Sequence, residues 1–454
     1  MKVELTDIGH GGVAIGHVDG KTVMANFGLP GETVRVRITR DKTTFLRGEV
    51  LEVCENPSPY RQPLAWEEAG PGGVGGAGLQ HVRFDYQQVW KTTVLRSTLR
   101  RIGGEKLTDH LADQGIEPTV RPIPGDDETG GWHTRTRIQL TAQGGRLGMN
   151  RVGKGRIIPI SRMPLAVAEI EERVGLFDGS FMSRVAGKNR GKNLFHDGAK
   201  VKAVAPSGSE PVVVVGNRVL AVNGEENHTP YVYEKMTVNG TEYRYRVNAD
   251  GFWQMHKSAG KELTHTVVDC AKVESGDHVL ELYAGAGLMT LPLADIVGER
   301  GSILALEGAR SAVDNAKANL RSYPQATART KNIDERMSEN ELNADVIIAD
   351  PPRTGLGIPL AKKIASSSAY RIVLVSCDAA SMARDVRALY EGGCRIVSMQ
   401  ALDMFPNTHH FETVALLSKL NTEHHLDIEI GEDELSEIDF SKDATYGEIK
   451  KFVL

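Results

Sequence analysis

The chain has 454 residues, a net charge of −5 and 40% hydrophobic residues, a composition typical of a globular protein with more than one domain. No apolar run approaches the roughly 20 residues that span a bilayer, and the amino terminus lacks the apolar core of a signal peptide. The four cysteines, at positions 54, 270, 377 and 394, form no CxxC pair. We therefore expect a reducing compartment, the cytoplasm, and no membrane partner.

Residues 1–54 predict short strands separated by glycine turns. In the stretch "ETVRVRIT", Val34, Val36 and Ile38 alternate with Arg35 and Arg37, which puts apolar side chains on one face of a strand and cations on the other. Five such strands fit a small barrel of the OB type, whose open face commonly binds single-stranded nucleic acid. A barrel that only packs against the next domain fits the pattern equally well.

Residues 55–230 predict a basic middle domain of α+β character. Its first part, to residue 82, is rich in proline and glycine and predicts a linker. Residues 84–103 predict an amphipathic helix that ends at glycine and can pack on a neighbouring domain. Residues 135–202 contain fourteen Lys or Arg and five Asp or Glu. Such a run is usually a solvated face, but this one is long enough to make phosphate binding a serious candidate.

Residues 231–420 alternate strands and helices, as in a doubly wound, Rossmann-like α/β domain. Parallel strands are predicted to end in "VLELYAGAG", "ILALEG", "IIADPPRTG" and "RIVLVSCD", and two further strands, joined by a loop containing "FPNTHH", should close the sheet as an antiparallel pair. Residues 421–454 carry ten Asp or Glu against three Lys or Arg and form an acidic tail without an assigned role.

The carboxyl edge of such a sheet is where α/β proteins place their chemistry. Gly285 and Gly287 allow a tight turn beside a ligand, and Glu307, 22 residues beyond Gly285, suits the hydroxyls of a ribose. Position 290 is threonine rather than the third glycine of a dinucleotide-binding turn, which favours S-adenosylmethionine over NAD. Asp350 ends a third strand and can face the methyl donor or a target base.

Cys377 ends the next strand and offers a nucleophile at the same edge. Carbon 5 of a pyrimidine is a poor nucleophile, but attack of a thiolate on carbon 6 turns the ring into an enolate that accepts a methyl group at carbon 5. The proton on carbon 5 must then leave, which requires a general base. Glu412 is the candidate, with His409 and His410 nearby. Alone, Cys377 would be interpreted as a packed thiol and Glu412 as an exposed carboxylate; together they indicate catalysis.

Several segments resemble the RNA 5-methyluridine methyltransferases, which methylate uridine in transfer RNA or large-subunit ribosomal RNA. They are "GFWQMH", "ELYAGAGLMTLPLA", "DPPRTGLG", "VSCDAASMARD" and "FPNTHHFETVALL", and residues 1–54 resemble the TRAM domain, the RNA-binding OB barrel of many members. The resemblance implies that Cys377 is the nucleophile and Glu412 the base. It also implies that S-adenosylmethionine is held by Gln254, Tyr283, Glu307, Asp350 and, in surroundings that match less well, Asn332.

One part of the family pattern is missing. Many members bind a [4Fe–4S] cluster through four cysteines, three of them in a segment ending "CGGCxLQH", whereas this chain has "VGGAGLQH". Val74, Ala77 and Met163 stand where ligands would be, and Cys54 alone cannot hold a cluster that needs four thiolates. We therefore expect no iron–sulfur cluster and no other metal.

These features predict a cytoplasmic, monomeric enzyme that methylates carbon 5 of a uridine in folded rRNA or tRNA, using S-adenosylmethionine and flipping the base out of its stack. Two alternatives stay open: an RNA-binding protein with an inactive methyltransferase domain, and an amino-methylating enzyme. Arg353 counts against the second, because amino-methylating enzymes usually carry an aromatic residue at that place after their DPP motif.

Overall fold

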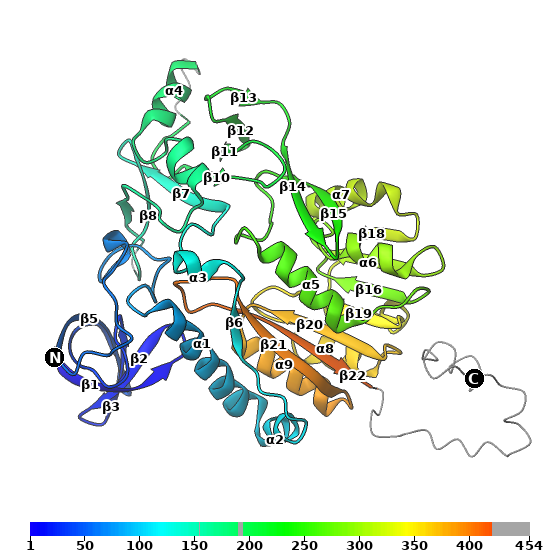
Figure 1. Cartoon of the computed structure of the whole chain (residues 1–454), viewed down its shortest axis with the longest axis horizontal. Helices are drawn as coiled ribbons and strands as arrows, with labels where there is room; N and C mark the ends of the chain where they lie inside the picture. The colour runs from blue at the N-terminus through cyan, green and yellow to red at the C-terminus, as the bar shows by residue number, and fades with distance from the viewer. Residues whose placement is uncertain (154, 189–193, 420–454) are drawn as a thin grey trace, which may run out of the picture. The chain divides into compact units, whose positions relative to one another are not determined.

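The computed structural model describes residues 1–153, 155–188 and 194–419 (Figure 1). The predicted acidic tail, residues 421–454, lies outside these ranges. The described residues form a closed barrel, a seven-stranded sheet, a two-stranded hairpin and an eight-stranded sheet. No helix within them is long and apolar enough to cross a membrane.

The first five strands close into a barrel in the order β1-β2-β3-β5-β4, as the sequence predicted. Val34 and Val36 of β4 are buried in it, and Arg35 between them is exposed. A Cβ at Gly48 would lie 2.3 Å from Cγ1 of Val36, so this glycine lets β5 cross β4 closely. The strands are β1 (Lys2–Gly9), β2 (Val13–Val18), β3 (Lys21–Asn26), β4 (Thr33–Asp41) and β5 (Phe45–Glu55).

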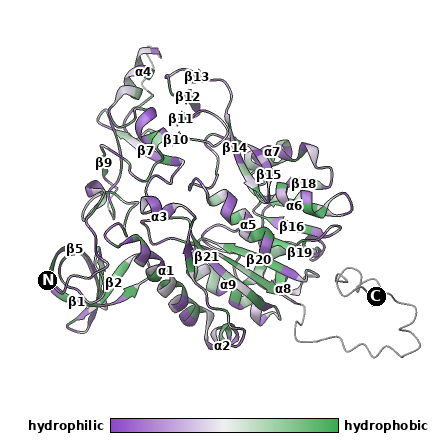
Figure 2. Ribbon diagram, in the orientation of Figure 1, coloured by the Kyte–Doolittle hydropathy of each residue, from purple (hydrophilic) through white to green (hydrophobic). Residues whose placement is uncertain are grey.

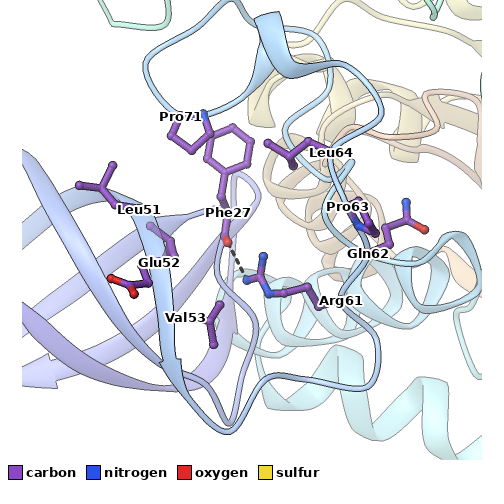
Figure 3. Close-up of a pocket in the computed structure, with 10 residues that line it drawn as sticks. Phe27, Leu51, Glu52, Val53, Arg61, Gln62, Pro63, Leu64 and Pro71 are labelled. Carbon is purple, nitrogen blue, oxygen red and sulfur yellow. Dashed lines mark hydrogen bonds between the residues drawn. The ribbon is translucent and has the colours of Figure 1, made fainter.

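An ion pair with a buried carboxylate joins the barrel to the linker that follows it. Nε and Nη2 of Arg61 each donate to the Glu32 carboxylate at 2.6 Å. Nη2 also donates to the Phe27 carbonyl at 2.8 Å, as Figure 3 shows. Glu32 is fully buried, and this two-point contact offsets the loss of its hydration. Beside the pair, Phe27, Leu64 and Pro71 help to line a groove of about 450 Å³.

The middle region builds a seven-stranded antiparallel sheet in the order β13-β12-β11-β10-β7-β8-β9. Its strands are β7 (Arg137–Gln143), β8 (Arg146–Asn150), β9 (Ile157–Pro159), β10 (Lys200–Val204), β11 (Val212–Val215), β12 (Arg218–Ala221) and β13 (Glu226–Asn227). The helices of this region are α1 (Phe84–Thr98), continued by a π-helical turn over Leu99–Gly103, then α2 (Glu105–Asp113), α3 (Asp126–Thr129) and α4 (Ser180–Lys188). The hairpin that follows pairs β14 (Tyr231–Val238) with β15 (Thr241–Asn248).

Three apolar side chains fill the positions of the missing cluster ligands. Val74, Ala77 and Met163, which we call the apolar triad, are each at most 2% exposed and share one core with Trp66. Cys54, by contrast, is exposed on β5 of the barrel. These residues do not fit an iron–sulfur cluster, because the site holds packed hydrocarbon and a thioether where the cluster needs thiolates.

The eight-stranded sheet has the order β18-β17-β16-β19-β20-β22-β21-β6. Its first five strands are parallel, and β22 lies antiparallel between β20 and β21, as the sequence predicted. The strand β6 (Val120–Pro122), from the middle region, pairs with β21 and was not predicted. The other strands are β16 (His278–Leu282), β17 (Ser302–Glu307), β18 (Ala326–Thr330), β19 (Val346–Ala349), β20 (Arg371–Ser376), β21 (Arg395–Asp403) and β22 (Glu412–Ser418).

Helices cover both faces of this sheet, and its central strands are accordingly apolar over residues 346–349 of β19 and 372–375 of β20 (Figure 2). One face packs on α1, α8 (Ile358–Ser366) and α9 (Ala379–Glu391). The other packs on α5 (Ala259–Ala271) and α6 (Thr290–Val297), while α7 (Arg310–Asn319) contacts β15, β17 and β18. The predicted doubly wound α/β class is confirmed.

Candidate active site

The carboxyl ends of four parallel strands meet at one edge of the sheet. In register, Leu282 of β16 lies beside Leu306 of β17 and Ala349 of β19, which in turn lies beside Leu374 of β20. The residues that follow these strand ends are therefore neighbours, because parallel strands in register end together. They are the predicted site residues Tyr283, Gly285, Gly287, Glu307, Asp350 and Cys377.

Cys377 is fixed between the end of β20 and the beginning of α9. The carboxylate of Asp378 caps α9 by accepting hydrogen bonds from the backbone N–H groups of Ala380, at 3.1 Å, and Ser381, at 2.8 Å. Burial and the nearby carboxyl of Glu412 raise the pKa of the half-buried Cys377 thiol to about 11, and the Arg353 guanidinium opposes them. The thiol is therefore protonated in the resting protein, with a cation beside it that favours its ionised form.

Glu412 is the first residue of β22 and is almost completely buried, at 4% exposure. Its neighbour Thr413 pairs with Ser376, the residue before Cys377, which brings the carboxyl to the same edge as the thiol. Burial, with a smaller contribution from Asp350, raises the pKa of Glu412 well above its ordinary value. Its Oε1 atom has no hydrogen-bond partner among the described residues. A buried carboxyl with a free oxygen is suited to accept a proton from a bound molecule.

The two histidines beside Glu412 are poorer bases. Burial is the main cause that lowers the pKa of His409 to about 4 and that of His410 to about 3, with neighbouring cations adding to it. Both imidazoles are neutral at pH 7 and hold a proton weakly, whereas the Glu412 carboxyl holds one unusually strongly. Nε2 of His410 lies 3.5 Å from Nη2 of Arg353, so this ring packs against the cation of the site.

The loop between β21 and β22, residues 404–411, is fixed from the side of α1. Gln87 donates from Nε2 to Oδ1 of Asn407, at 3.0 Å, and its Oε1 accepts from the Asn407 backbone N–H, at 2.9 Å. Lys91 forms a fully buried ion pair with Asp403 and also donates to the Phe405 carbonyl at 3.2 Å. Because Glu412 follows this loop directly, these contacts position the carboxyl although none of them touches it.

The "DPPRTGLG" loop is fixed by α9. Gly355 has φ +72°, and a Cβ there would lie 2.1 Å from Oδ2 of Asp385, so only glycine fits. That oxygen accepts the Leu356 backbone N–H at 2.7 Å. Arg384 donates to the Thr354 carbonyl at 2.7 Å. The preceding Arg353 is thereby held next to Cys377 and Glu412.

The glycine turn and Glu307 form the second half of the site. The Gly285 backbone N–H donates to Oε2 of Glu307 at 3.0 Å, and the Ala309 backbone N–H donates to Oε1 at 2.7 Å. Gly285 has φ +57°, and a Cβ there would meet no atom within 4 Å, so the turn has open space beside it. A carboxylate fixed beside an open glycine turn fits the ribose and amino-acid parts of S-adenosylmethionine.

Other segments of the chain lie beside the glycine turn and Glu307 and complete the second half of the site. The Tyr283 hydroxyl donates to the Ile333 carbonyl at 3.2 Å, and the Lys331 backbone N–H donates to the Glu307 carbonyl at 2.9 Å. Asn332 lies between these two contacts and is exposed. Gln254 is 8% exposed and follows the strongly exposed Phe252 by two positions.

One carboxyl of this half was not predicted. Glu281 lies on β16, is 3% exposed and accepts a hydrogen bond from the Thr290 hydroxyl at 2.6 Å. Burial raises its pKa to about 8 and that of Asp350 to about 7. A cationic ligand bound beside these buried carboxyls would favour their ionised forms, whereas an anionic ligand would oppose ionisation.

Comparison with known proteins identifies the family. The sequence profile of the tRNA (uracil-5-)-methyltransferase family matches residues 225–420, and the profile of the TRAM domain matches residues 1–51. An RNA methyltransferase of Bifidobacterium longum, itself uncharacterized, is 34% identical over 434 residues, which cover 90% of this chain and 94% of that protein. The chain belongs to the uracil-5 RNA methyltransferases.

A further relative and a solved structure are similar over most of the chain, the structure in its fold. The 23S rRNA (uracil(1939)-C(5))-methyltransferase RlmD of Acinetobacter baylyi is 26% identical, over 88% of this chain and 90% of its own. A Pyrococcus abyssi tRNA (uracil-54, C5)-methyltransferase, solved with S-adenosyl-L-homocysteine, shares the fold with a TM-score of 0.65 at 22% identity, over 92% of this chain and 100% of that chain. This uracil-5 RNA methyltransferase is an S-adenosylmethionine-dependent enzyme with a TRAM domain and an RNA substrate.

Proposed function

We propose that the enzyme methylates carbon 5 of a uridine in folded rRNA or tRNA through a covalent bond between Sγ of Cys377 and carbon 6 of the base. The observation that carries the proposal is the free, buried Oε1 of Glu412 beside this thiol. Leaving a buried polar atom unpaired costs about 1–3 kcal/mol. Such an atom is expected where a bound substrate supplies the missing partner, and the proton on carbon 5 is the group that this chemistry must remove.

The reaction begins at the thiol. The Cys377 proton leaves to solvent, and the Arg353 guanidinium stabilises the thiolate that remains. The thiolate bonds to carbon 6, and the electrons of the carbon 5–carbon 6 double bond move towards the oxygen on carbon 4. Carbon 5 becomes nucleophilic as a result.

When bound, S-adenosylmethionine would supply the methyl group that carbon 5 accepts, with cleavage of its sulfonium–methyl bond and release of S-adenosylhomocysteine. Glu412 then removes the proton from carbon 5, and that electron pair re-forms the double bond to carbon 6. The bond between carbon 6 and sulfur breaks, which returns the thiolate of Cys377. The raised pKa of Glu412 makes it a stronger proton acceptor once it is ionised.

We propose that each of the remaining site residues contacts either the cofactor or the flipped uracil. Glu307, fixed by two backbone N–H groups, is proposed to accept from ribose hydroxyls, and the open turn at Gly285 and Gly287 to let the cofactor approach the backbone. The further proposed cofactor contacts are Gln254, Tyr283, Asn332 and Asp350. Phe252 is 75% exposed two residues before Gln254, and we propose that its ring stacks on the flipped uracil.

The test separates the roles of the two catalytic residues. Cys377→Ala should bind S-adenosylmethionine but form no 5-methyluridine, because the ring is never activated. Glu412→Gln should turn over about 10²–10⁴-fold more slowly and should accumulate an enzyme–RNA adduct that survives boiling in detergent, because elimination requires loss of the carbon 5 proton. The adduct should vanish in the double variant.

Matched controls use residues of the same type elsewhere. Cys54→Ala, an exposed thiol on the barrel, and Glu391→Gln, an exposed carboxyl on α9, should leave both turnover and adduct unchanged. Near-normal activity of Cys377→Ala would refute the covalent mechanism. If Glu412→Gln methylates RNA at the wild-type rate without an adduct, another group removes the proton from carbon 5, and His409 or His410 would be tested next. Mapping 5-methyluridine in tRNA and rRNA from a strain without the gene would identify the substrate.

The proposed setting of the enzyme is the cytoplasm, and the proposed active form is the monomer. An exposed Cys54 and a half-buried Cys377 both have free thiols, which suits a reducing compartment. Sedimentation of the purified enzyme tests the second point, and a stable dimer would contradict it.

A further inference from the structure

The outer face of the β14–β15 hairpin carries alternating aromatic and guanidinium side chains. Arg244 lies over the ring of Tyr233, 4.1 Å from its centroid, and Arg246 lies over the ring of Tyr231, at 4.3 Å. Tyr233 also stands directly opposite Arg246 in the strand register. The four side chains therefore follow one another without a gap, and we call them the Tyr–Arg ladder.

The ladder faces outward because the opposite face of the hairpin is buried. Val232 on β14 and Tyr245 and Val247 on β15 are at most 1% exposed and pack in one core with Trp253. A slip of one residue would move all of these side chains into solvent, so the register is fixed. Tyr233 is 36% exposed, and the proposed mechanism makes no use of it.

Among the described residues, the positive charge of the ladder is not paired with a carboxylate. Arg246 donates to uncharged acceptors on α7, to Oδ1 of Asn315 at 3.0 Å and to the Asp314 carbonyl at 2.7 Å. In the described ranges no carboxylate forms an ion pair with Arg244 or Arg246. The neighbouring Lys235 is paired with Glu242 at 3.3 Å.

We propose that the Tyr–Arg ladder is a stacking platform for unpaired nucleotides that flank the target uridine. Aromatic rings and guanidinium planes are the surfaces on which proteins stack single-stranded bases, and cations beside them bind the phosphates. The inference rests on the proposed function, because it takes the RNA substrate as given and assigns a place to the nucleotides next to the flipped base.

The position of the ladder in the chain supports this assignment. β15 ends at Asn248 on the ladder face, and the chain continues directly to the exposed Phe252 and to Gln254 of the candidate site. A flipped uridine leaves its neighbours without a stacking partner. The Tyr–Arg ladder supplies a stacking partner beside the segment that is proposed to contact the flipped base.

The test compares binding of single-stranded and double-stranded RNA. For the double variant Tyr233→Ala/Arg244→Ala, we expect affinity for a fluorescein-labelled oligouridylate to fall about 10- to 100-fold, the range of stacking on one base. Affinity for a blunt RNA duplex should fall much less, because its bases are not available to stack. Tyr233→Phe should bind as the wild type does, and Arg244→Lys should lose part of the affinity, because it keeps the charge but not the plane.

A second tyrosine–arginine pair provides the matched control. Arg83 lies 6.0 Å from the centroid of Tyr60, which is 38% exposed, but Arg83 is paired with Asp85 at 2.6 Å. Tyr60→Ala/Arg83→Ala removes the same atoms without removing an unpaired charge and should change oligouridylate binding little. Thermal melting of each variant checks the fold.

The outcomes separate this inference from the proposed function. Wild-type affinity in the Tyr233→Ala/Arg244→Ala variant, or an equal loss for duplex and oligouridylate, or an equal loss in the control pair, would overturn the stacking platform. Failure of the wild-type enzyme to form 5-methyluridine on total RNA would overturn the proposed function alone. In the expected case the ladder variant methylates total RNA with a raised KM and a kcat near that of the wild type.

Discussion

The buried ion pair between Lys91 and Asp403 connects an early helix to the loop before the candidate base. Both side chains are 0% exposed, Asp403 also accepts from Nε2 of Gln88 at 3.2 Å, and Lys91 also donates to the Phe405 carbonyl. Lys91→Met would leave the Asp403 carboxylate buried with one neutral donor. Breaking such a pair costs about 3–5 kcal/mol, which corresponds to a fall in Tm of about 6–20 °C for a domain of this size.

Replacing both partners tests whether the loss of stability comes from the unpaired buried charge. In Lys91→Met/Asp403→Leu neither charge remains, and such exchanges are often neutral or stabilising. We therefore expect its Tm to be much closer to that of the wild type than the Tm of Lys91→Met. Lys362→Met, at an exposed position on α8, is the control and should lie within about 0.5 kcal/mol of the wild type.

The other single variant should depend on pH. Burial already lowers the pKa of Lys91 from 10.5, and Asp403 opposes that shift. In Asp403→Leu the lysine pKa falls further, so the unfolded chain binds more protons than the folded one between that lowered pKa and the unfolded value near 10.5. The stability of Asp403→Leu should therefore increase as pH rises towards 10.5, relative to the wild type. A Lys91→Met enzyme that melts with the wild type would show that the pair does not hold this loop.

Three further predictions concern the metal, the RNA and the pH dependence. Because the apolar triad fills the ligand positions, protein purified without oxygen should be colourless and iron-free by metal analysis; a brown preparation with about four irons per chain would contradict this. RNA affinity should fall steeply with salt, since the exposed arginines of the middle region include Arg146, Arg156 and Arg162; a flat response would make that region a solvated face only. The rate kcat/KM should rise with pH above neutrality, because Cys377 and Glu412, with their raised pKa values, must both ionise; a rate that falls over that range would exclude Glu412 as the base.

The sheet could be predicted from the sequence because its signals are local. The strand at residues 371–376 contains an apolar run over 372–375 and is followed by a helix cap residue, Asp378. The turn at Gly285 needs a residue that tolerates positive φ. That the strand ends meet at one edge then follows from the alternation of strands and helices, although the order of the strands does not. Cys377 and Glu412 were found because each stands where a strand begins or ends.

The support of the site could not be predicted in this way. Gln87 and Asn407 are 320 positions apart, and nothing in the helix pattern of residues 84–103 distinguishes a glutamine that binds a distant loop from one that faces solvent. Lysine side chains are mostly exposed, so Lys91 would be expected on the solvated side of an amphipathic helix. In the structure it is fully buried. The three residues of β6 are too few to show any period. Arg353 was recognised only as a missing aromatic residue, because its effect on the thiol depends on the fold.

The free oxygen of Glu412 explains why the enzyme needs that distant support. A buried carboxyl without a partner destabilises its surroundings, and a mobile loop would relieve the penalty by turning the group towards solvent or a backbone donor. The contacts of Gln87 and Lys91 prevent this, since they hold both backbone and side chains of the loop that precedes β22. The protein thus keeps the Glu412 carboxyl in place before any substrate arrives, and in the proposed mechanism the uridine would supply the interaction that the resting carboxyl lacks.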